Sequence, residues 1–436
     1  HNQGYRVSGS DLRESPILER MRSLGISVSV GHAAENLGEV DVVVYSSAVP
    51  PQNAELREAE RRGIPVIPRA EMLAEAMRLK EGIAVAGSHG KTTTTSLIAH
   101  VLSSAGLDPT AVIGGRVFAP DTAPSTTRLG AGDLLVAEAD ESDGSFLRLT
   151  PVIAVITNID SEHLDHYGSY EALEGAFVSF ANRVPFWGLT VLCLDHPGVQ
   201  AIVPRMTRRT TTYGFASQAD LVASNLRNEP PGTRFEVRRR SERLGDVRLR
   251  LPGRHNVLNA LATVAVALEQ GVSFETAADA LSAFLGIERR FETKGIAAGI
   301  RVVDDYGHHP AEIRATLAAA REIHSGRIVV AFQPHRYTRT RDLWAEFVTA
   351  FNDADILVLT DVYSAGEEKI PDVEAARLAD AIRAHGHRDV RFAANLEDVV
   401  AELSATARAG DLALTLGAGS ISQVGGRLLA ALEERP

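Results

Sequence analysis

The feature that most constrains the fold is a short glycine-rich stretch in the first quarter of the chain. An apolar run at residues 83–86 is followed by GSHGKT at residues 87–92 and then by an apolar helical segment at residues 97–102. A strand, a glycine turn and a helix in this order place backbone N–H groups and a helix N-terminus around an anion. Lys91 is suited to the β- and γ-phosphate oxygens of a nucleotide, and Thr92 to a magnesium ion.

The loop departs from the usual P-loop spacing, which needs a glycine at position 85, where this chain has Val85. Only the shorter pattern Gly-x-x-Gly-Lys-Thr is present. The alternative is a strand-to-helix connection that glycine merely tightens, with Lys91 exposed to solvent. We favour phosphate binding because Lys-Thr at a helix start after two spaced glycines is a specific combination.

Acidic residues gather where the next predicted strand ends. The run at residues 133–137 leads into EADESD at residues 138–143, which holds four carboxylates. Neighbouring carboxylates repel one another unless a cation or hydrogen-bond donors are present, and open α/β sheets bind ligands at the carboxyl ends of their strands. Glu138, directly after the apolar run, is therefore the best magnesium candidate. Two or three of the four carboxylates fit a solvated acidic turn.

A histidine follows the third predicted strand. The apolar run at residues 152–156 leads into TNIDSEHLDHY at residues 157–167, and His163 would lie beside Glu138 if the two strands were neighbours in one sheet. Histidine is an uncommon ligand for magnesium, a hard ion that prefers oxygen. The alternative for His163 is a hydrogen-bonded loop histidine.

Short β-branched runs alternate with helical stretches along most of the chain, which is typical of parallel α/β sheets. At about 150 residues per domain, the 436 residues predict two or three domains. A Glu-rich helix at 71–80 marks a first boundary, and a third open parallel sheet begins near residue 295. We therefore expect α/β domains at 1–80, 81–294 and 295–436, with antiparallel strands at 220–251 and third-domain helices at 311–323, 341–351 and 373–385.

Charge and cysteine content limit the class of protein. The net charge of −11 argues against a nucleic-acid or anionic-membrane partner. We expect the one cysteine, Cys193, to be a buried structural thiol in a reducing compartment. No run of about 18 apolar residues is present, so a cytoplasmic protein is predicted. The one basic run, residues 238–240 with Arg243, fits a solvated strand or turn.

Seven motifs occur in the order found in the Mur ligases, and the chain closely resembles that family over nearly all of its length. Besides the three segments above, they are RHNVLNA at 254–260, RRF at 289–291, DDYGHHP at 304–310 and QPHRYTRTR at 333–341. The resemblance implies a Rossmann-like N-terminal domain for a UDP-sugar, a central P-loop ATPase domain and a Rossmann-like C-terminal domain that closes over the site. We expect a monomer or a homodimer.

The resemblance also implies roles for individual residues, with ATP and Mg²⁺ as cofactors. The catalytic set is Lys91, Glu138, His163 and Arg290, and the magnesium set is Thr92, Glu138 and His163. The residues assigned to ATP are Gly87, Ser88, His89, Gly90, Lys91, Thr92, Thr93, Asn256, Asn259, Arg290 and Asp305. Those assigned to the substrates are Ser8, Ser10, Asp11, Ser46, Ser47, His308, His335, Arg336 and Arg339.

The residues by themselves leave alternatives for three of these groups. Asn256 and Asn259, three apart on one helical face, would also serve as interhelical hydrogen-bonding groups. The two histidines before Pro310 would also cap the helix that follows. The basic residues at 335–339 would also form a basic helix start or loop surface.

The implied reaction joins L-alanine to the lactyl carboxylate of UDP-N-acetylmuramate through an acyl phosphate, with release of ADP and phosphate. The alternatives are a murein tripeptide ligase, which adds recycled tripeptide to the same UDP-sugar, and a nucleotide-binding regulator without ligase activity. The family's opening glycine-rich turn, which precedes the segment at residues 4–11, is absent. We therefore expect an N-terminally incomplete UDP-sugar pocket, of which residues 8–11 and 46–48 remain.

Overall fold

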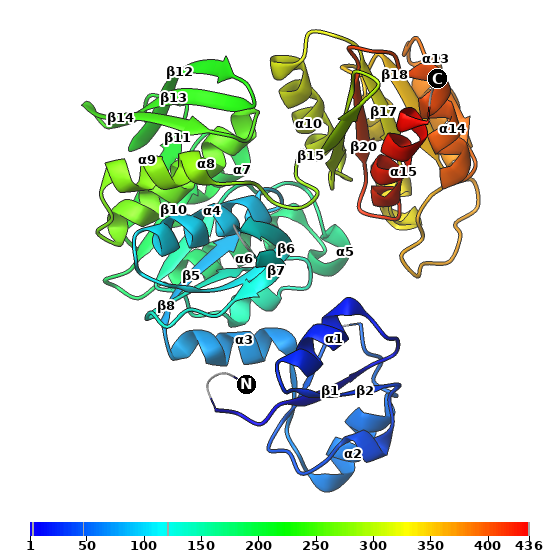
Figure 1. The fold of residues 1–436 in the computed structure, drawn as a ribbon. Helices are drawn as coiled ribbons and strands as arrows, with labels where there is room; N and C mark the ends of the chain where they lie inside the picture. The colour runs from blue at the N-terminus through cyan, green and yellow to red at the C-terminus, as the bar shows by residue number, and fades with distance from the viewer. Residues whose placement is uncertain (2–3, 47, 120–121, 435–436) are drawn as a thin grey trace. The chain divides into compact units, whose positions relative to one another are not determined.

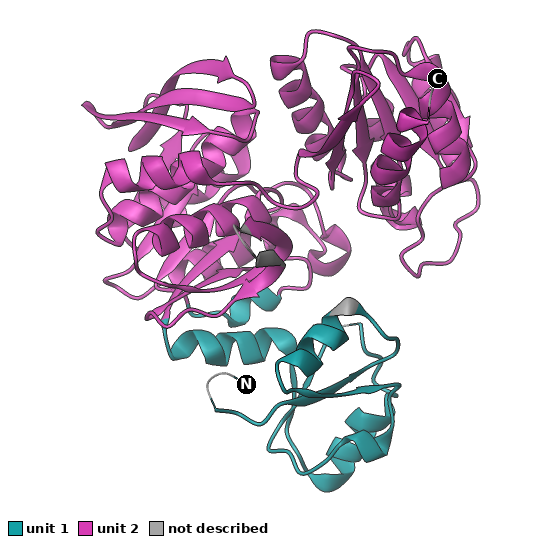
Figure 2. Cartoon of the chain, viewed as in Figure 1, with its two compact units in different colours: residues 1–80, 145–150 teal, residues 81–144, 151–436 magenta. Residues whose placement is uncertain are grey.

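The computed structural model describes residues 1, 4–46, 48–119 and 122–434. The chain divides into two compact units, residues 1–80 with 145–150 and residues 81–144 with 151–436 (Figure 2). The second unit contains two separate sheets, so that the chain has three α/β parts, as predicted.

The first unit contains two small parallel sheets, β1 with β2 and β3 with β4. The parallel pairing predicted here is confirmed, although in two separate pairs of strands. The Asn53 side chain caps α2 by accepting hydrogen bonds from the backbone N–H groups of Glu55 and Leu56. The elements are β1 (Ser8–Asp11), α1 (Pro16–Ser23), β2 (Ser27–Val30), β3 (Val43–Tyr45), α2 (Ala54–Arg62), β4 (Val66–Pro68) and α3 (Arg69–Arg78).

A ten-stranded sheet forms the first part of the second unit, in the order β14-β13-β12-β11-β10-β9-β5-β8-β6-β7 (Figure 1). The pairs from β12 to β6 are parallel, whereas β13, β14 and β7 pair antiparallel at the two edges. The antiparallel edge predicted for 220–251 is confirmed; the edge made by β7 was not predicted. The strands are β5 (Glu81–Ala86), β6 (Thr110–Ala119), β7 (Thr122–Arg128), β8 (Leu134–Glu138), β9 (Ile153–Ile156), β10 (Leu189–Cys193), β11 (Thr210–Gly214), β12 (Leu221–Glu229), β13 (Gly232–Arg239) and β14 (Glu242–Leu249).

The core of this part lies between the sheet and a layer of apolar helices. Ile83 and Val85 of β5 pack with Leu97 of α4 and Leu261 of α8 in one buried cluster. The helix predicted at 97–102 is longer, because the buried threonines after Lys91 already belong to it. The helices are α4 (Lys91–Ser104), α5 (Leu164–Tyr167), α6 (Tyr170–Asn182), α7 (Pro197–Ile202), α8 (Arg254–Glu269) and α9 (Phe274–Ala283).

A six-stranded sheet forms the C-terminal part, in the order β15-β16-β20-β17-β18-β19. The prediction of an open parallel sheet needs one correction, because β15 pairs antiparallel with β16. The predicted helix at 341–351 is wrong as a single element, since α11 and α12 are separated at Leu343. The elements are β15 (Glu292–Ala297), β16 (Ile300–Asp305), α10 (Pro310–Ile323), β17 (Ile328–Phe332), α11 (Tyr337–Asp342), α12 (Trp344–Val348), β18 (Ile356–Thr360), α13 (Ala375–Ala384), β19 (Val390–Ala393), α14 (Leu396–Thr406), β20 (Leu412–Leu416) and α15 (Ser422–Glu433).

Alternate residues of the central strand β17 enter two different cores, as the two-residue period of a strand requires. Val330 and Phe332 pack with α10 and α13 on one face, and Val329 and Ala331 pack with α14 and α15 on the other. This sheet is therefore covered on both faces, which explains why its strands are continuous apolar runs.

Three strands of the ten-stranded sheet position the candidate site. β5 pairs in parallel with β8 on one side and with β9 on the other, so their carboxyl ends meet at one edge. β8 and β9 are consequently not direct neighbours, which was the condition for placing His163 beside Glu138. The predicted phosphate-binding loop, residues 87–90 and hereafter the phosphate loop, follows β5 and lies between the segments that carry these two residues.

Two smaller predictions are confirmed. Cys193 is 2% exposed, and burial raises the pKa of its thiol to about 11, as expected for a structural cysteine. Arg238, Arg239 and Arg240 are exposed at the end of β13 and in the turn after it. Among the helices of the described residues, none is long and apolar enough to cross a membrane.

Candidate active site

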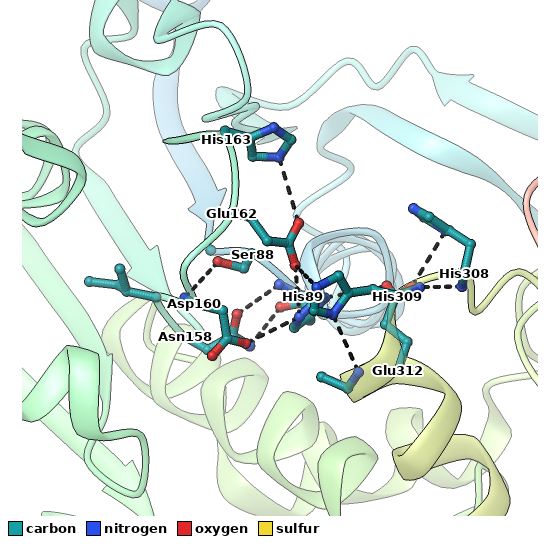
Figure 3. Close-up of polar contacts among 12 residues, drawn as sticks. Ser88, His89, Asn158, Asp160, Glu162, His163, His308, His309 and Glu312 are labelled. Atoms are coloured by element: carbon teal, nitrogen blue, oxygen red, sulfur yellow. Dashed lines mark hydrogen bonds and ion pairs between the residues drawn. The ribbon is translucent and has the colours of Figure 1, made fainter. Parts of the chain in front are cut away.

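The phosphate loop is fixed against the segment that follows β9. Gly87 has φ +135°, and a Cβ at this position would collide with the Thr157 hydroxyl. The backbone N–H of His89 donates to Asn158 Oδ1 at 2.7 Å, and the backbone N–H of Asp160 donates to Ser88 Oγ at 2.8 Å (Figure 3). The loop is thus held by contacts outside itself, which suits a pre-formed anion site.

Lys91 is the first residue of α4, and its ammonium is enclosed by oxygens. Its Nζ lies 2.8 Å from each oxygen of Glu141 and donates to the Gly87 carbonyl at 2.6 Å. The side chain of Lys91 is 15% exposed and that of Glu141 is 1% exposed, so the alternative of a solvent-exposed lysine is wrong. Burial lowers the pKa of Lys91, but the Glu141 carboxylate outweighs it and raises that pKa, which keeps the ammonium charged.

Glu138 and Thr92 place two oxygen donors together. The Thr92 hydroxyl donates to the Glu138 carboxylate at 3.0 Å, and the Gly114 N–H donates to the same carboxylate at 2.9 Å. A carboxylate and a hydroxyl facing a cavity are the hard oxygen ligands that Mg²⁺ prefers, so this pair fits the predicted cofactor. His163 instead has its Nε2 3.9 Å from Glu141 and 3.7 Å from Glu162, and burial lowers its pKa.

Two cavities of the second unit bring most of the predicted residues together. One, of about 540 Å³, is lined by Ser88, His89, Gly90, Lys91, Thr92, Glu138, His163, Arg290, His308 and Arg339, among others. The other, of about 380 Å³, is lined by His89, Gly90, Thr93, Asn256, Asn259, Arg290 and Asp305, among others. Because His89, Gly90 and Arg290 line both, the phosphate loop separates two adjoining spaces. A nucleotide with its phosphates in the first and its base in the second would pass these residues.

The two asparagines of α8 are held by hydrogen bonds within the protein. Asn256 Nδ2 donates to the Pro252 carbonyl at 2.7 Å, and Asn259 Nδ2 donates to Asn256 Oδ1 at 3.2 Å. The Thr94 hydroxyl of α4 donates to Asn259 Oδ1 at 3.1 Å, so the interhelical alternative is confirmed for Asn259. Both residues still line the second cavity.

Asp305 and Arg290 lie on the C-terminal side of these cavities. Asp305 is buried at the end of β16 and accepts hydrogen bonds from the N–H groups of Phe291 and Gly307, each at 2.8 Å. Burial raises its pKa. The Arg290 guanidinium lies over the Tyr306 ring, 5.2 Å from its centre, and 3.9 Å from Glu312.

Three of the four predicted substrate residues of the C-terminal part lie together. The His308 and His335 rings are 5.7 Å apart, and Arg339 Nη1 lies 3.2 Å from His335 Nδ1. Burial lowers the pKa of His308, and it lowers the pKa of His335 to about 4. Arg336 instead pairs with Glu367 at 2.6 Å and is half exposed, so the alternative of a basic loop surface describes this residue.

The remaining predicted substrate residues belong to the first unit. The Ser10 hydroxyl donates to Glu55 at 2.8 Å and lies 2.9 Å from His32 Nδ1. Ser8 and Asp11 are exposed in β1, and Ser46 Oγ accepts a hydrogen bond from the Ala48 N–H at 3.3 Å. Ser47 lies outside the described residues.

Comparison with known protein families gives three matches that together span most of the chain. Residues 1–81 match the Mur ligase family catalytic domain, residues 85–267 the Mur ligase middle domain, and residues 289–419 the Mur ligase glutamate ligase domain.

The chain belongs to the Mur ligase family.

Two relatives of this Mur ligase are UDP-N-acetylmuramate–L-alanine ligases. That of Anaeromyxobacter dehalogenans is 58% identical over 99% of this chain and 93% of its own length, and that of Myxococcus xanthus is 58% identical over 100% and 92%. Among solved structures, the UDP-N-acetylmuramate-alanine ligase MurC of Thermotoga maritima superposes with a TM-score of 0.82 at 29% identity, over 98% of this chain and 94% of that one. A murein peptide ligase of Psychrobacter arcticus shares the fold, with a TM-score of 0.70 at 24% identity over 100% and 95%.

Four carboxylates of this Mur ligase site were not predicted from the sequence as site residues. Glu141 was one of the four acidic residues at 138–143, of which two or three were expected to be solvated, and the structure instead buries it against Lys91. Asp160 and Glu162 contact the ring of His89, as does Glu312 from the first turn of α10. The sequence signal that could have identified Asp160 and Glu162 is their position directly after a buried strand. Glu312 had a signal as well, since it follows the cap residue His309 by three positions, as in a capping box.

Proposed function

We propose that this chain joins L-alanine to the lactyl carboxylate of UDP-N-acetylmuramate in peptidoglycan precursor synthesis, converting ATP to ADP and phosphate. The observation that carries the proposal is the 58% identity, along 99% of the chain, to the UDP-N-acetylmuramate–L-alanine ligase of Anaeromyxobacter dehalogenans. We assign the UDP-sugar to residues 1–80, ATP to 81–294 and L-alanine to 295–436. We further propose that the protein is a cytoplasmic monomer or homodimer that has no nucleic-acid or membrane partner.

The proposed nucleotide site uses the groups that surround the two cavities. Lys91 and the N–H groups of residues 90–92 at the start of α4 would hold the phosphates, while Asn256, Asn259 and Asp305 line the space for the base. Thr92 and Glu138 would hold Mg²⁺, which supplies neutralisation of phosphate charge when it is bound. His163, 3.7 Å from Glu162, would serve a second metal position.

The proposed chemistry begins with activation of a carboxylate, because O²⁻ is too poor a leaving group for an amine to displace. A lactyl carboxylate oxygen attacks the γ-phosphorus of ATP, ADP leaves, and an acyl phosphate forms. Lys91 and Arg290 are placed to offset the negative charge of the transferring group. The alanine amine then attacks the acyl carbon, and phosphate leaves.

The attacking amine must be neutral, and the C-terminal part offers a proton acceptor. His308 lies beside His335 and Arg339, which would face the carboxylate of the incoming amino acid. Since burial lowers the pKa of His308, its imidazole is neutral near pH 7 and able to accept a proton.

The test is ADP release from ATP and UDP-N-acetylmuramate, with either L-alanine or the tripeptide as the amine. We expect L-alanine to stimulate release and the tripeptide to leave the background rate unchanged. Stimulation by the tripeptide alone would make the protein a murein tripeptide ligase. ATP binding without release in either mixture would make it a nucleotide-binding regulator.

A further inference from the structure

His89 is enclosed by carboxylates from two parts of the second unit (Figure 3). Its Nε2 lies 3.1 Å from Asp160 and 3.0 Å from Glu162, both in the segment after β9. Its Nδ1 lies 3.4 Å from Glu312, in the first turn of α10. The phosphate loop is therefore linked through one side chain to the domain that carries the substrate-side groups.

The surroundings determine the charge of His89. Both ring nitrogens lie within 3.4 Å of carboxylate oxygens, an arrangement that favours the doubly protonated imidazolium. Burial lowers the pKa of His89, but its close contacts with the carboxylates of Asp160, Glu162 and Glu312 outweigh it and hold this pKa well above its usual value. His89 is thus an imidazolium between carboxylates.

The same residues also have the composition of a transition-metal site, since ligand atoms of His89, Glu162 and His309 all lie within 4.8 Å of one another. Their hydrogen bonds argue against it. His309 Nδ1 accepts the Ala311 N–H at 3.3 Å, so its proton is on Nε2, which faces Glu162 at 3.5 Å. A metal ligand needs a free lone pair at that nitrogen. The cluster is therefore a set of N–H donors facing carboxylates.

Glu312 is held in position by the start of its own helix. Its Oε2 accepts the backbone N–H groups of His308 at 3.0 Å and His309 at 3.2 Å, completing a capping box with the His309 side chain. The other oxygen, Oε1, faces His89. The same carboxylate binds the backbone N–H of His308. A movement of α10 away from His89 would therefore also move His308 away from the phosphate loop.

We propose that His89 is a positioning residue whose ion pair with Glu312 aligns the C-terminal domain with the phosphate loop. The proposal rests on the proposed function, which it deepens. When the pair is formed, His308 and Arg339 share one cavity with Lys91. When the pair is broken, the phosphate loop and the substrate-side groups are still present, but this ion pair no longer fixes their positions relative to each other.

The test is a double-mutant cycle with His89→Gln and Glu312→Gln in the full chain. Glutamine at 312 keeps an oxygen for the two capping hydrogen bonds and removes the charge. We expect each single variant to lower kcat/KM for L-alanine by about 10- to 100-fold, as misalignment of reacting groups does. The double variant should be no slower than the slower single variant, because both changes break one link. Glu322→Gln, on the same helix, is the matched control and should stay within about 3-fold of the parent.

Two outcomes of this cycle would overturn the proposal. One is multiplication of the two losses in the double variant, which would show independent roles. The other is full activity of Glu312→Gln. Stoichiometric binding of Zn²⁺ by the parent, lost in His89→Gln, would also overturn it, because the cluster would then be a metal site.

Small-angle scattering with ADP separates this proposal from the assignment of L-alanine as substrate. Compaction on adding ADP in the parent and in Glu322→Gln, but not in Glu312→Gln, supports the link whatever amine the enzyme uses. Equal compaction in all three proteins contradicts it. Circular dichroism of each variant checks that the fold is retained.

Discussion

Replacing Lys91 by methionine is expected to lower alanine-dependent ADP release on the order of 10³-fold or more. The ammonium lies at the start of α4 and lines the same cavity as Thr92, Glu138 and Arg290. Methionine keeps the apolar stem but removes the charge that is proposed to offset that of the transferring phosphoryl group. The measurement is the ADP release rate at saturating ATP, UDP-N-acetylmuramate and L-alanine.

The control for this variant deals with Glu141, which would be left buried without its cation. Breaking a buried ion pair from one side costs about 3–5 kcal/mol of stability, so Lys91→Met alone should unfold at a lower temperature. Lys91→Met combined with Glu141→Gln removes both charges and should recover most of that stability while staying inactive. Recovery of activity in the double variant would show that Lys91 only neutralises Glu141.

Glu138→Gln is expected to lower ADP release by about 10²- to 10³-fold at saturating Mg²⁺ and to raise the Mg²⁺ concentration needed for half-maximal rate. Glutamine retains an oxygen to accept the hydrogen bonds from Thr92 and Gly114, which are 3.0 and 2.9 Å long in the parent. The variant therefore loses the negative charge of the proposed metal ligand with little change to the strand end. The measurement is a Mg²⁺ titration of the ADP release rate.

Glu288 offers a matched control for this prediction. It lines the same cavity, is about one-third exposed and pairs with Arg116 at 3.5 Å. Glu288→Gln should remain within about 3-fold of the parent at every Mg²⁺ concentration. An unchanged Mg²⁺ requirement in Glu138→Gln would remove Glu138 from the metal site.

Local patterns were enough to predict the elements that carry the site. The glycine pair and Lys-Thr predicted the loop between β5 and α4, and the apolar runs predicted β8 and β9 within a residue or two. The order of strands was not predictable in this way, because β5 enters between β8 and β9 through long-range pairing. In the structure His163 contacts Glu141, in the segment after β8, and Glu162, and it lines the same cavity as Glu138.

Electrostatic partners far apart in sequence were the least predictable part of the site. In the local sequence Glu141 is one of four acidic residues in a turn. Only the fold buries it against Lys91, which lies 50 positions earlier in the chain. Glu312 reads locally as a cap residue, which it is, but its second oxygen meets His89 of another domain. The local sequence does not distinguish Arg336 from Arg339. The pairing of Arg336 with Glu367 depends on the loop after β18, which is distant in sequence.

The protein is proposed to activate the lactyl carboxylate with the γ-phosphoryl group of ATP before L-alanine attacks. This step is tested with UDP-N-acetylmuramate labelled with ¹⁸O in that carboxylate and with ³¹P NMR of the phosphate released. Because a carboxylate oxygen attacks phosphorus and leaves with it, each turnover should transfer one carboxylate oxygen to phosphate, in equal amount to ADP and dependent on L-alanine. Unlabelled phosphate, or AMP with pyrophosphate, would rule out an acyl phosphate formed with the γ-phosphoryl group.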